Sequence, residues 1–235
     1  MNHAHLRSFL DQRVRDGVIR RVLGKWMNAG ILENGVLSHP EEGVPQGGSI
    51  SPMLSNLYRH EVLDLWCEQE VKPRRRGQAF MVRFADDAVL GFEREEDARK
   101  VLAVLAKRVA RFGLTLHPEK TRLVEFRNPE RRPDGTQRDR SFDMLGFTHY
   151  WGRSRKGRWI VKRKTAKSRF TRTLRRLNEG CRRNRHHPVM EQPTALNRKL
   201  RGHEAYFGIT GNAPARSRLR GEGNPRGRKW LNRRS

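Results

Sequence analysis

Two apolar runs flank a pair of adjacent carboxylates in residues 80–92, which read Phe80-Met81-Val82-Arg83-Phe84-Ala85-Asp86-Asp87-Ala88-Val89-Leu90-Gly91-Phe92. Phe80, Val82 and Phe84 recur at the period of two that is typical of a β-strand. The residues between the runs are few enough for a tight hairpin turn, in which Asp tolerates a positive φ. The stretch therefore predicts two antiparallel strands with the Asp pair at their turn.

The adjacent Asp86 and Asp87 have two interpretations. Like charges held side by side at a rigid turn repel each other, and a divalent cation would remove that cost. Hard oxygen ligands suit Mg²⁺. The pair could thus be half of a metal site for phosphoryl transfer, or a solvated turn, because Asp is a common turn residue.

The charge balance of the 235 residues is strongly basic, with 51 Lys and Arg against 25 Asp and Glu, a net charge of +26. Such a surplus predicts a polyanionic partner, nucleic acid before an anionic membrane surface. The surplus lies in residues 153–235, which hold 26 basic and 4 acidic residues. The sequence therefore predicts a nearly neutral enzyme core followed by a basic nucleic-acid clamp.

The sequence gives little support for a zinc site, a redox site or a membrane segment. Cys67 and Cys181 match no metal or redox spacing, so reduced thiols are expected. His60-Glu61 resembles the start of a zinc motif, but Asp64 stands where the second His would be needed. No signal peptide or membrane-spanning run is found, which favours a cytoplasmic protein of prokaryotic type without a membrane partner.

Apolar periodicity predicts the remaining elements. Helices are expected in residues 3–29 (two of them), 51–70, 95–112, 165–181 and 194–207. Hairpins or strand pairs are expected in 31–37, 114–126 and 142–147. Residues 127–140 are expected to form a polar loop, and the Gly-, Pro- and Arg-rich residues 213–235 to be disordered or loosely ordered.

Two further motifs could contact phosphates. The glycine-rich residues 43–52 lead into a helix, with Ser51 expected to cap it and Pro52 at its first position. Glycines before a helix let the backbone approach a phosphate or a base closely, although an ordinary loop fits equally well. Lys120 beside the turn of 114–126 could face a phosphate or be a solvated surface charge.

Taken in order, these pieces resemble the reverse transcriptase and maturase proteins of group II introns, from the first helix to about residue 212. Residues 43–52 resemble the family's Pro-Gln-Gly loop, and 82–87 its catalytic Tyr-Ala-Asp-Asp hairpin, with Phe84 in place of Tyr. Residues 113–121 resemble its Lys turn, 142–147 its primer-grip hairpin, and 201–212 its thumb or maturase segment.

The resemblance implies an α+β fold. It predicts a partial palm of antiparallel sheet backed by helices in residues 1–149, a basic helical thumb or maturase domain in 150–212, and a basic tail in 213–235. It also implies that the fingers domain is absent and that the family's first palm Asp lies just upstream of His3, so the palm would lack its third metal carboxylate. Whether the chain dimerises is left open.

The activity implied by the resemblance is RNA-directed DNA polymerisation with two Mg²⁺ ions, for which Mn²⁺ could substitute. Its partners would be intron RNA, an RNA template with a DNA primer, and deoxynucleoside triphosphates. The alternatives are an RNA-binding maturase module that does not polymerise, or a decayed fragment without a stable fold.

The resemblance assigns roles to particular residues. Asp86 and Asp87 would hold the metals, and Lys120 would protonate or neutralise the leaving group. Nucleotide and template would meet Pro45, Gln46, Gly47, Gly48 and Phe84, and the primer end would meet Leu145, Gly146 and Phe147. The expected RNA-binding residues are Lys162, Arg163, Lys164, Arg172, Arg175, Arg176, Arg201 and His203.

Overall fold

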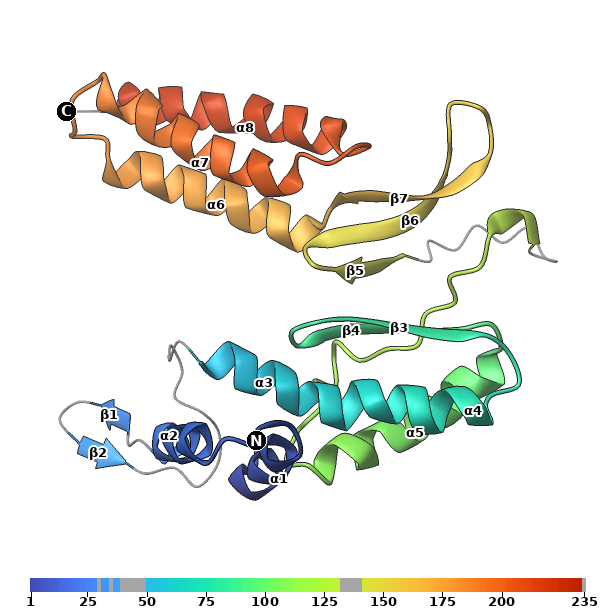
Figure 1. Ribbon diagram of the computed structural model, residues 1–235. Coiled ribbons are helices and arrows are strands. Elements are labelled where there is room, and N and C mark those ends of the chain that lie inside the picture. Colours follow the sequence, from blue (N-terminus) through green and yellow to red (C-terminus); the bar gives the residue numbers. More distant parts are fainter. Residues whose placement is uncertain (29–30, 34–35, 39–49, 132–140, 234–235) are drawn as a thin grey trace. The chain divides into compact units, whose positions relative to one another are not determined.

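The computed structural model describes residues 1–28, 31–33, 36–38, 50–131 and 141–233 (Figure 1). The chain divides into two compact units, Met1–Leu123 and Val124–Ser235. Both units combine helices with small antiparallel sheets, which confirms the predicted α+β class.

The first unit begins with two short capped helices. Helix α1 (His3–Arg13) is capped by the Asn2 side chain, and α2 (Gly17–Met27) by the Asp16 side chain, each accepting backbone N–H groups of the first turn. Strands β1 (Ile31–Glu33) and β2 (Val36–Ser38) then pair antiparallel. The two predicted helices and the hairpin are confirmed.

A long helical rod follows, made of α3 (Ser51–Arg59), the π-helical turns η1 (His60–Asp64) and η2 (Cys67–Val71), and α4 (Lys72–Arg74). Ile50, not Ser51, stands at its N-cap, and no side chain caps it, so the expected Ser51 cap is wrong. A π-helical turn changes the direction in which the following side chains point. This matters for η1, whose side chains reach two different elements.

Two apolar clusters form the core of the first unit. One joins α1, α2 and α3 around Tyr58, whose side chain is fully buried and whose hydroxyl donates to Phe112 O at 2.5 Å. The other joins the rod to α5 (Glu95–Ala110), a predicted helix, around Trp66 and Val109. The second cluster also supports the β-hairpin of residues 79–92, because Met81, Leu90 and Phe92 pack against it.

The acidic hairpin consists of β3 (Ala79–Phe84) and β4 (Asp87–Phe92), paired antiparallel with Phe84 opposite Asp87. This confirms the predicted strands and turn. Met81 packs against the second cluster, whereas Phe80, Val82 and Phe84 are each more than half exposed. The apolar alternation therefore places a hydrophobic face outward.

The predicted strand pair over 114–126 is wrong. The structure has no strand there; a turn forms at residues 118–120, and the backbone N–H groups of Lys120 and Thr121 donate to His117 O. Leu114 and Leu116 instead pack against the second cluster. Their alternation reflects contact with helices, not pairing with a neighbouring strand. A short 3₁₀ turn, η3 (Pro129–Arg131), follows.

The second unit carries a three-stranded antiparallel sheet of β5 (Phe142–Met144), β6 (Phe147–Arg153) and β7 (Trp159–Thr165), in that order. Because β6 pairs with both neighbours, residues 142–165 form one sheet. The division between units accordingly falls after Leu123, upstream of the boundary expected after residue 149.

Three helices complete the second unit: α6 (Lys167–Arg183), α7 (Glu191–Phe207) and α8 (Ala213–Leu231). Their core is Leu177, Leu200 and Leu219. The disorder or loose order expected for residues 213–235 is wrong, because α8 covers Ala213–Leu231. Gly223 brings it close to Leu177, and burial of Leu219 offsets the low helix propensity of its glycines and Pro225.

Candidate functional site

The Asp pair lies at the tip of the β3–β4 hairpin, where a two-residue turn of Ala85 and Asp86 joins the strands. Ala85 has φ +51°, a conformation that a residue with a side chain rarely adopts. The sequence predicts a positive φ at an Asp of this turn, whereas the structure has it at Ala85. Strained backbone of this kind costs free energy and persists only where its surroundings hold it.

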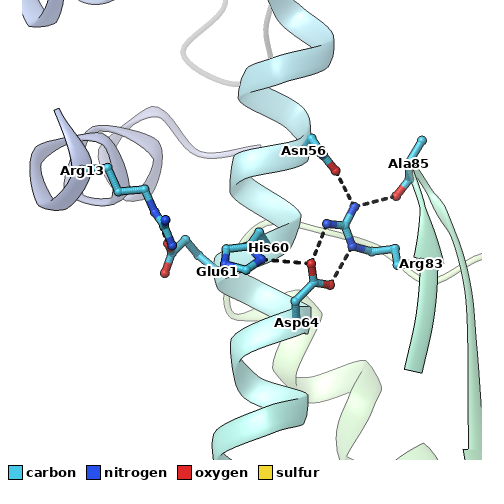
Figure 2. A network of polar contacts seen from close by, with 7 residues as sticks. All are labelled: Arg13, Asn56, His60, Glu61, Asp64, Arg83 and Ala85. Atoms are coloured by element: carbon cyan, nitrogen blue, oxygen red, sulfur yellow. Dashed lines mark hydrogen bonds and ion pairs between the residues drawn. The ribbon is translucent and has the colours of Figure 1, made fainter. Parts of the chain in front are cut away.

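Arg83 holds this turn from the inner face of the hairpin (Figure 2). Its Nε and Nη2 donate to the two carboxylate oxygens of Asp64, each at 2.7 Å, and its Nη1 donates to Asn56 Oδ1 at 2.7 Å and Ala85 O at 3.2 Å. The Arg83 side chain is only 9% exposed. One guanidinium therefore joins the strained turn to two residues of the rod, Asn56 and Asp64.

The acceptor Asp64 is ionised at neutral pH. Burial by itself would raise its pKa, but hydrogen bonds from Arg83 and His60, together with their charges, lower the pKa below its ordinary value. His60 Nδ1 lies 3.1 Å from Asp64 Oδ2. The same pairing raises the pKa of Arg83, so the contact joins two full charges.

The π-helical turn η1 also contacts α1. Arg13 donates to Glu61 Oε1 through Nε at 2.8 Å and Nη2 at 2.5 Å (Figure 2). Glu61 and Asp64 thus point to different elements from one turn. In the sequence, His60, Glu61 and Asp64 suggest only an incomplete zinc motif. The overlooked signal is Arg83, a lone charge on the strand face that also carries Met81.

Asp86 has a cationic partner within the chain. Arg59 Nη2 lies 2.6 Å from Asp86 Oδ1, and Arg59 Nη1 donates to Ser55 O at 3.2 Å. The Asp86 side chain is nevertheless 76% exposed. Asp87, the first residue of β4, follows it in the chain. The repulsion within the Asp pair is therefore partly relieved by an arginine.

The described part of the chain does not provide a complete two-metal site. No group of three or more His, Cys, Asp or Glu side chains gathers there in a geometry that could hold a metal ion. Two metal ions a few ångströms apart need several bridging carboxylates. The hairpin supplies two carboxylates, one of them already in an ion pair with Arg59.

The other residues assigned to nucleotide and template binding are only partly placed. Phe84 is 64% exposed and lies directly across the strand pair from Asp87. Lys120 is exposed at its turn, and no contact described for it reaches the Asp pair. Pro45, Gln46, Gly47 and Gly48 lie outside the described residues.

The predicted primer-grip residues form a second strained hairpin tip. Leu145 and Gly146 join β5 to β6 with φ of +53° and +80°. The Tyr206 hydroxyl donates to Leu145 O at 2.9 Å, and Phe147 packs against Tyr206 and Phe207 with ring centroids 5.8 and 5.1 Å apart. This tip is therefore fixed by α7 of its own unit.

Most of the predicted RNA-binding side chains are accessible. Lys162 is half-buried, and those fully exposed are Arg163, Lys164, Arg172, Arg175, Arg176 and Arg201. His203 differs: both of its ring nitrogens are buried without a hydrogen-bond partner in the described structure, and its ring stacks on Phe207 at 4.4 Å. Burial lowers the pKa of His203, so it offers no positive charge at neutral pH.

Two further observations concern the cysteines and the apolar character of the helices. Cys67 and Cys181 are both free thiols. Among the helices of the described ranges, none combines the length and the apolar character needed to cross a bilayer.

Known proteins are similar to parts of the chain. The family model described as reverse transcriptase (RNA-dependent DNA polymerase) matches residues 5–149. The group II intron-encoded protein LtrA of Lactococcus lactis subsp. cremoris is 26% identical over 118 residues, which cover 46% of this chain and 20% of LtrA. Protein YkfC of Escherichia coli (strain K12) is 38% identical over 61 residues, 26% of this chain and 16% of YkfC. The aligned part of the chain thus spans a fifth or less of the length of these relatives.

Proposed function

Because the chain belongs to the reverse transcriptase (RNA-dependent DNA polymerase) family, we propose that it serves RNA-directed DNA synthesis of the group II intron type. Its similarity to a group II intron-encoded protein supports that class. The observation that carries the proposal is the exposed Asp86-Asp87 pair on a hairpin tip that Arg83 and Arg59 hold in place.

In this proposal Asp86 and Asp87 are part of a site for Mg²⁺ or Mn²⁺ that is completed by ligands beyond the described residues. Carboxylates suit either ion. Asp86 must give up its contact with Arg59 before it can hold a cation. Phe84, exposed across from Asp87, would contact a nucleotide or template, and Lys120 would neutralise a leaving group.

We expect Asp86→Asn to lower primer extension on an RNA template at least tenfold, because it removes the charge of one proposed ligand while keeping its size. The measurement is incorporation of deoxynucleotides by the purified chain in the presence of Mg²⁺. Asp11→Asn is the matched control, since Asp11 is another exposed carboxylate of the first unit in an ion pair, with Arg20. Equal extension by wild type and Asp86→Asn would refute the assignment of Asp86.

A second candidate function is RNA binding without polymerisation. It is favoured by the net charge of residues 153–235 and by the Asp86–Arg59 pair. It is also favoured by the lack, among the described residues, of a group of three or more side chains that could hold a metal ion. Absence of extension by the wild-type chain, together with salt-dependent RNA binding, would select this candidate over the first.

We expect replacement of Arg172, Arg175 and Arg176 by Gln to weaken RNA binding and to flatten its salt dependence. All three are exposed on α6. Each phosphate contact contributes about 0.7 to the slope of log Kd against log salt for a single strand, so the slope should fall by roughly 2. The measurement is fluorescence anisotropy with labelled RNA over a salt series.

The control for this triple variant removes three exposed cations of α5 and its C-terminal end, by replacing Lys100, Lys107 and Arg111 with Gln. It changes the net charge equally and should leave the slope nearly unchanged. If both triple variants flatten the slope to the same extent, RNA binding depends on net charge alone and α6 is not its site.

A further inference from the structure

The register of β6 and β7 divides three consecutive cations between the two faces of the sheet. Tyr150 pairs with Lys162, Thr148 with Lys164, and His149 with Arg163. Side chains of paired residues share a face, and neighbours along a strand alternate. Lys162 and Lys164 therefore lie on the face of Tyr150, and Arg163 lies on the opposite face.

The face that carries Arg163 is occupied by the protein's own aromatic side chains. His149 stacks on Phe142 with ring centroids 4.9 Å apart, and Phe126 packs on Phe142 and Trp151 at 5.0 and 5.6 Å. Phe147 on the same face packs against α7. Aromatic side chains on this side of the sheet therefore pack against one another and against α7.

The opposite face has a different chemistry. Lys164 Nζ lies 4.9 Å from the centre of the Tyr150 ring. The stem of Lys162 lies over Gly152, where an added Cβ would be 2.9 Å from Lys162 Cδ. The face therefore carries one aromatic ring with an ammonium group against it, a second lysine stem across Gly152, and the exposed Ile160 opposite Gly152.

The charges of this face are available to a ligand. No ion pair described in the structure joins Lys162 or Lys164 to a carboxylate. Asp143 shares the face, but its Oδ1 already accepts the Thr148 hydroxyl at 2.5 Å. The face thus has a net positive charge that a polyanion would complement.

The turn that joins the two strands continues this charge. In Figure 1 the β6–β7 hairpin projects beyond the three helices of its unit. Its tip is closed by a hydrogen bond from Ser154 N to Arg158 O at 2.7 Å, with Gly157 at φ +76°. Arg155, Lys156 and Arg158 are all exposed there.

We propose that this face, made of Tyr150, Gly152, Lys162 and Lys164, is a platform for single-stranded RNA. A base stacks on Tyr150, the two lysines bind the flanking phosphates, and the strand runs on toward the basic turn. Stacking on an aromatic ring beside a cationic track is how single strands are held without sequence preference. A duplex keeps its bases stacked internally and cannot use Tyr150 in this way. The inference deepens the RNA binding proposed above and rests on it.

The test compares three variants of the full chain in anisotropy titrations with a labelled oligouridine. The Lys162→Gln/Lys164→Gln pair should lower the salt slope by about 1.4, since each single-strand phosphate contact contributes about 0.7. Tyr150→Leu should weaken binding about tenfold with an unchanged slope, as expected for one lost stacking contact. Lys100→Gln, which removes an exposed cation of α5, should change Kd less than twofold.

A second readout is independent of the variants. Photo-crosslinking of RNA that contains 5-iodouridine to the wild-type chain should yield an adduct on Tyr150, located by mass spectrometry. A loss of affinity from Lys100→Gln as large as that from the lysine pair, or preference for a duplex of the same length, would overturn the platform while leaving RNA binding intact. Failure of the wild-type chain to bind any RNA would instead overturn the proposed RNA binding itself.

Discussion

Replacement of Asn212 by alanine is expected to lower the free energy of unfolding of the second unit by about 3 kcal/mol. The Asn212 side chain is 1% exposed and makes three hydrogen bonds. Its Oδ1 accepts from Thr165 N at 2.9 Å, and its Nδ2 donates to Thr165 Oγ1 at 2.9 Å and to Phe207 O at 2.8 Å. Alanine leaves these buried partners unsatisfied. Urea unfolding followed by circular dichroism measures the loss.

Asn178 provides the control for this prediction. It is a half-buried amide of the same unit that accepts one hydrogen bond, from Trp230 Nε1 at 2.9 Å. Asn178→Ala should therefore cost only about 1 kcal/mol. If the two substitutions cost the same, Asn212 does not hold the end of β7 to the connection between α7 and α8, and the packing of the three helices must be sufficient without it.

Asn212 also shows where sequence reasoning stops. The helices over 95–110 and 167–183 and the hairpins at 85–86 and 145–146 were predictable, because periodicity and turn chemistry act over a few residues. The Asn212–Thr165 contact joins residues 47 apart in the chain. In the sequence, Asn212 is only a polar residue of a Gly-containing turn, and nothing local marks it as buried.

The same limit applies to the candidate site. Asp86 and Asp87 were found because they are adjacent and lie between two strands. Their supporting residues were not found, because Arg83 meets Asp64 across 19 positions and Asp86 meets an arginine that precedes it in a different element. The prediction of strands in 114–126 was wrong for a related reason. Apolar residues also alternate in an extended segment that packs against helices, as Leu114 and Leu116 do.

Replacement of Arg83 by leucine is expected to destabilise the first unit by about 3 kcal/mol at pH 7, because it leaves the half-buried Asp64 carboxylate with only His60 as a partner. The loss in free energy of unfolding should be larger at neutral pH than in acid. Arg83 and His60 keep the folded-state pKa of Asp64 below its ordinary value, so the wild-type contribution is complete above the unfolded pKa and disappears as the pH falls through the folded pKa. In the variant, burial favours the neutral carboxyl, so protonation in acid relieves its penalty.

The difference in free energy of unfolding between wild type and Arg83→Leu should accordingly be largest at neutral pH and shrink between about pH 5 and pH 3. This window is set by the ordinary Asp pKa of about 3.9 and by the downward shift of the Asp64 pKa in the folded protein. Urea unfolding at pH 7, 5 and 3 measures it. Arg99→Leu is the control, since Arg99 pairs with Glu95 on the exposed face of α5 and should contribute less than about 0.5 kcal/mol. A pH-independent difference would show that Arg83 acts through packing alone. A loss that follows the ionisation of Asp64 would show that the Arg83–Asp64 charge pair, whose guanidinium also donates to Ala85 O in the turn, stabilises the first unit.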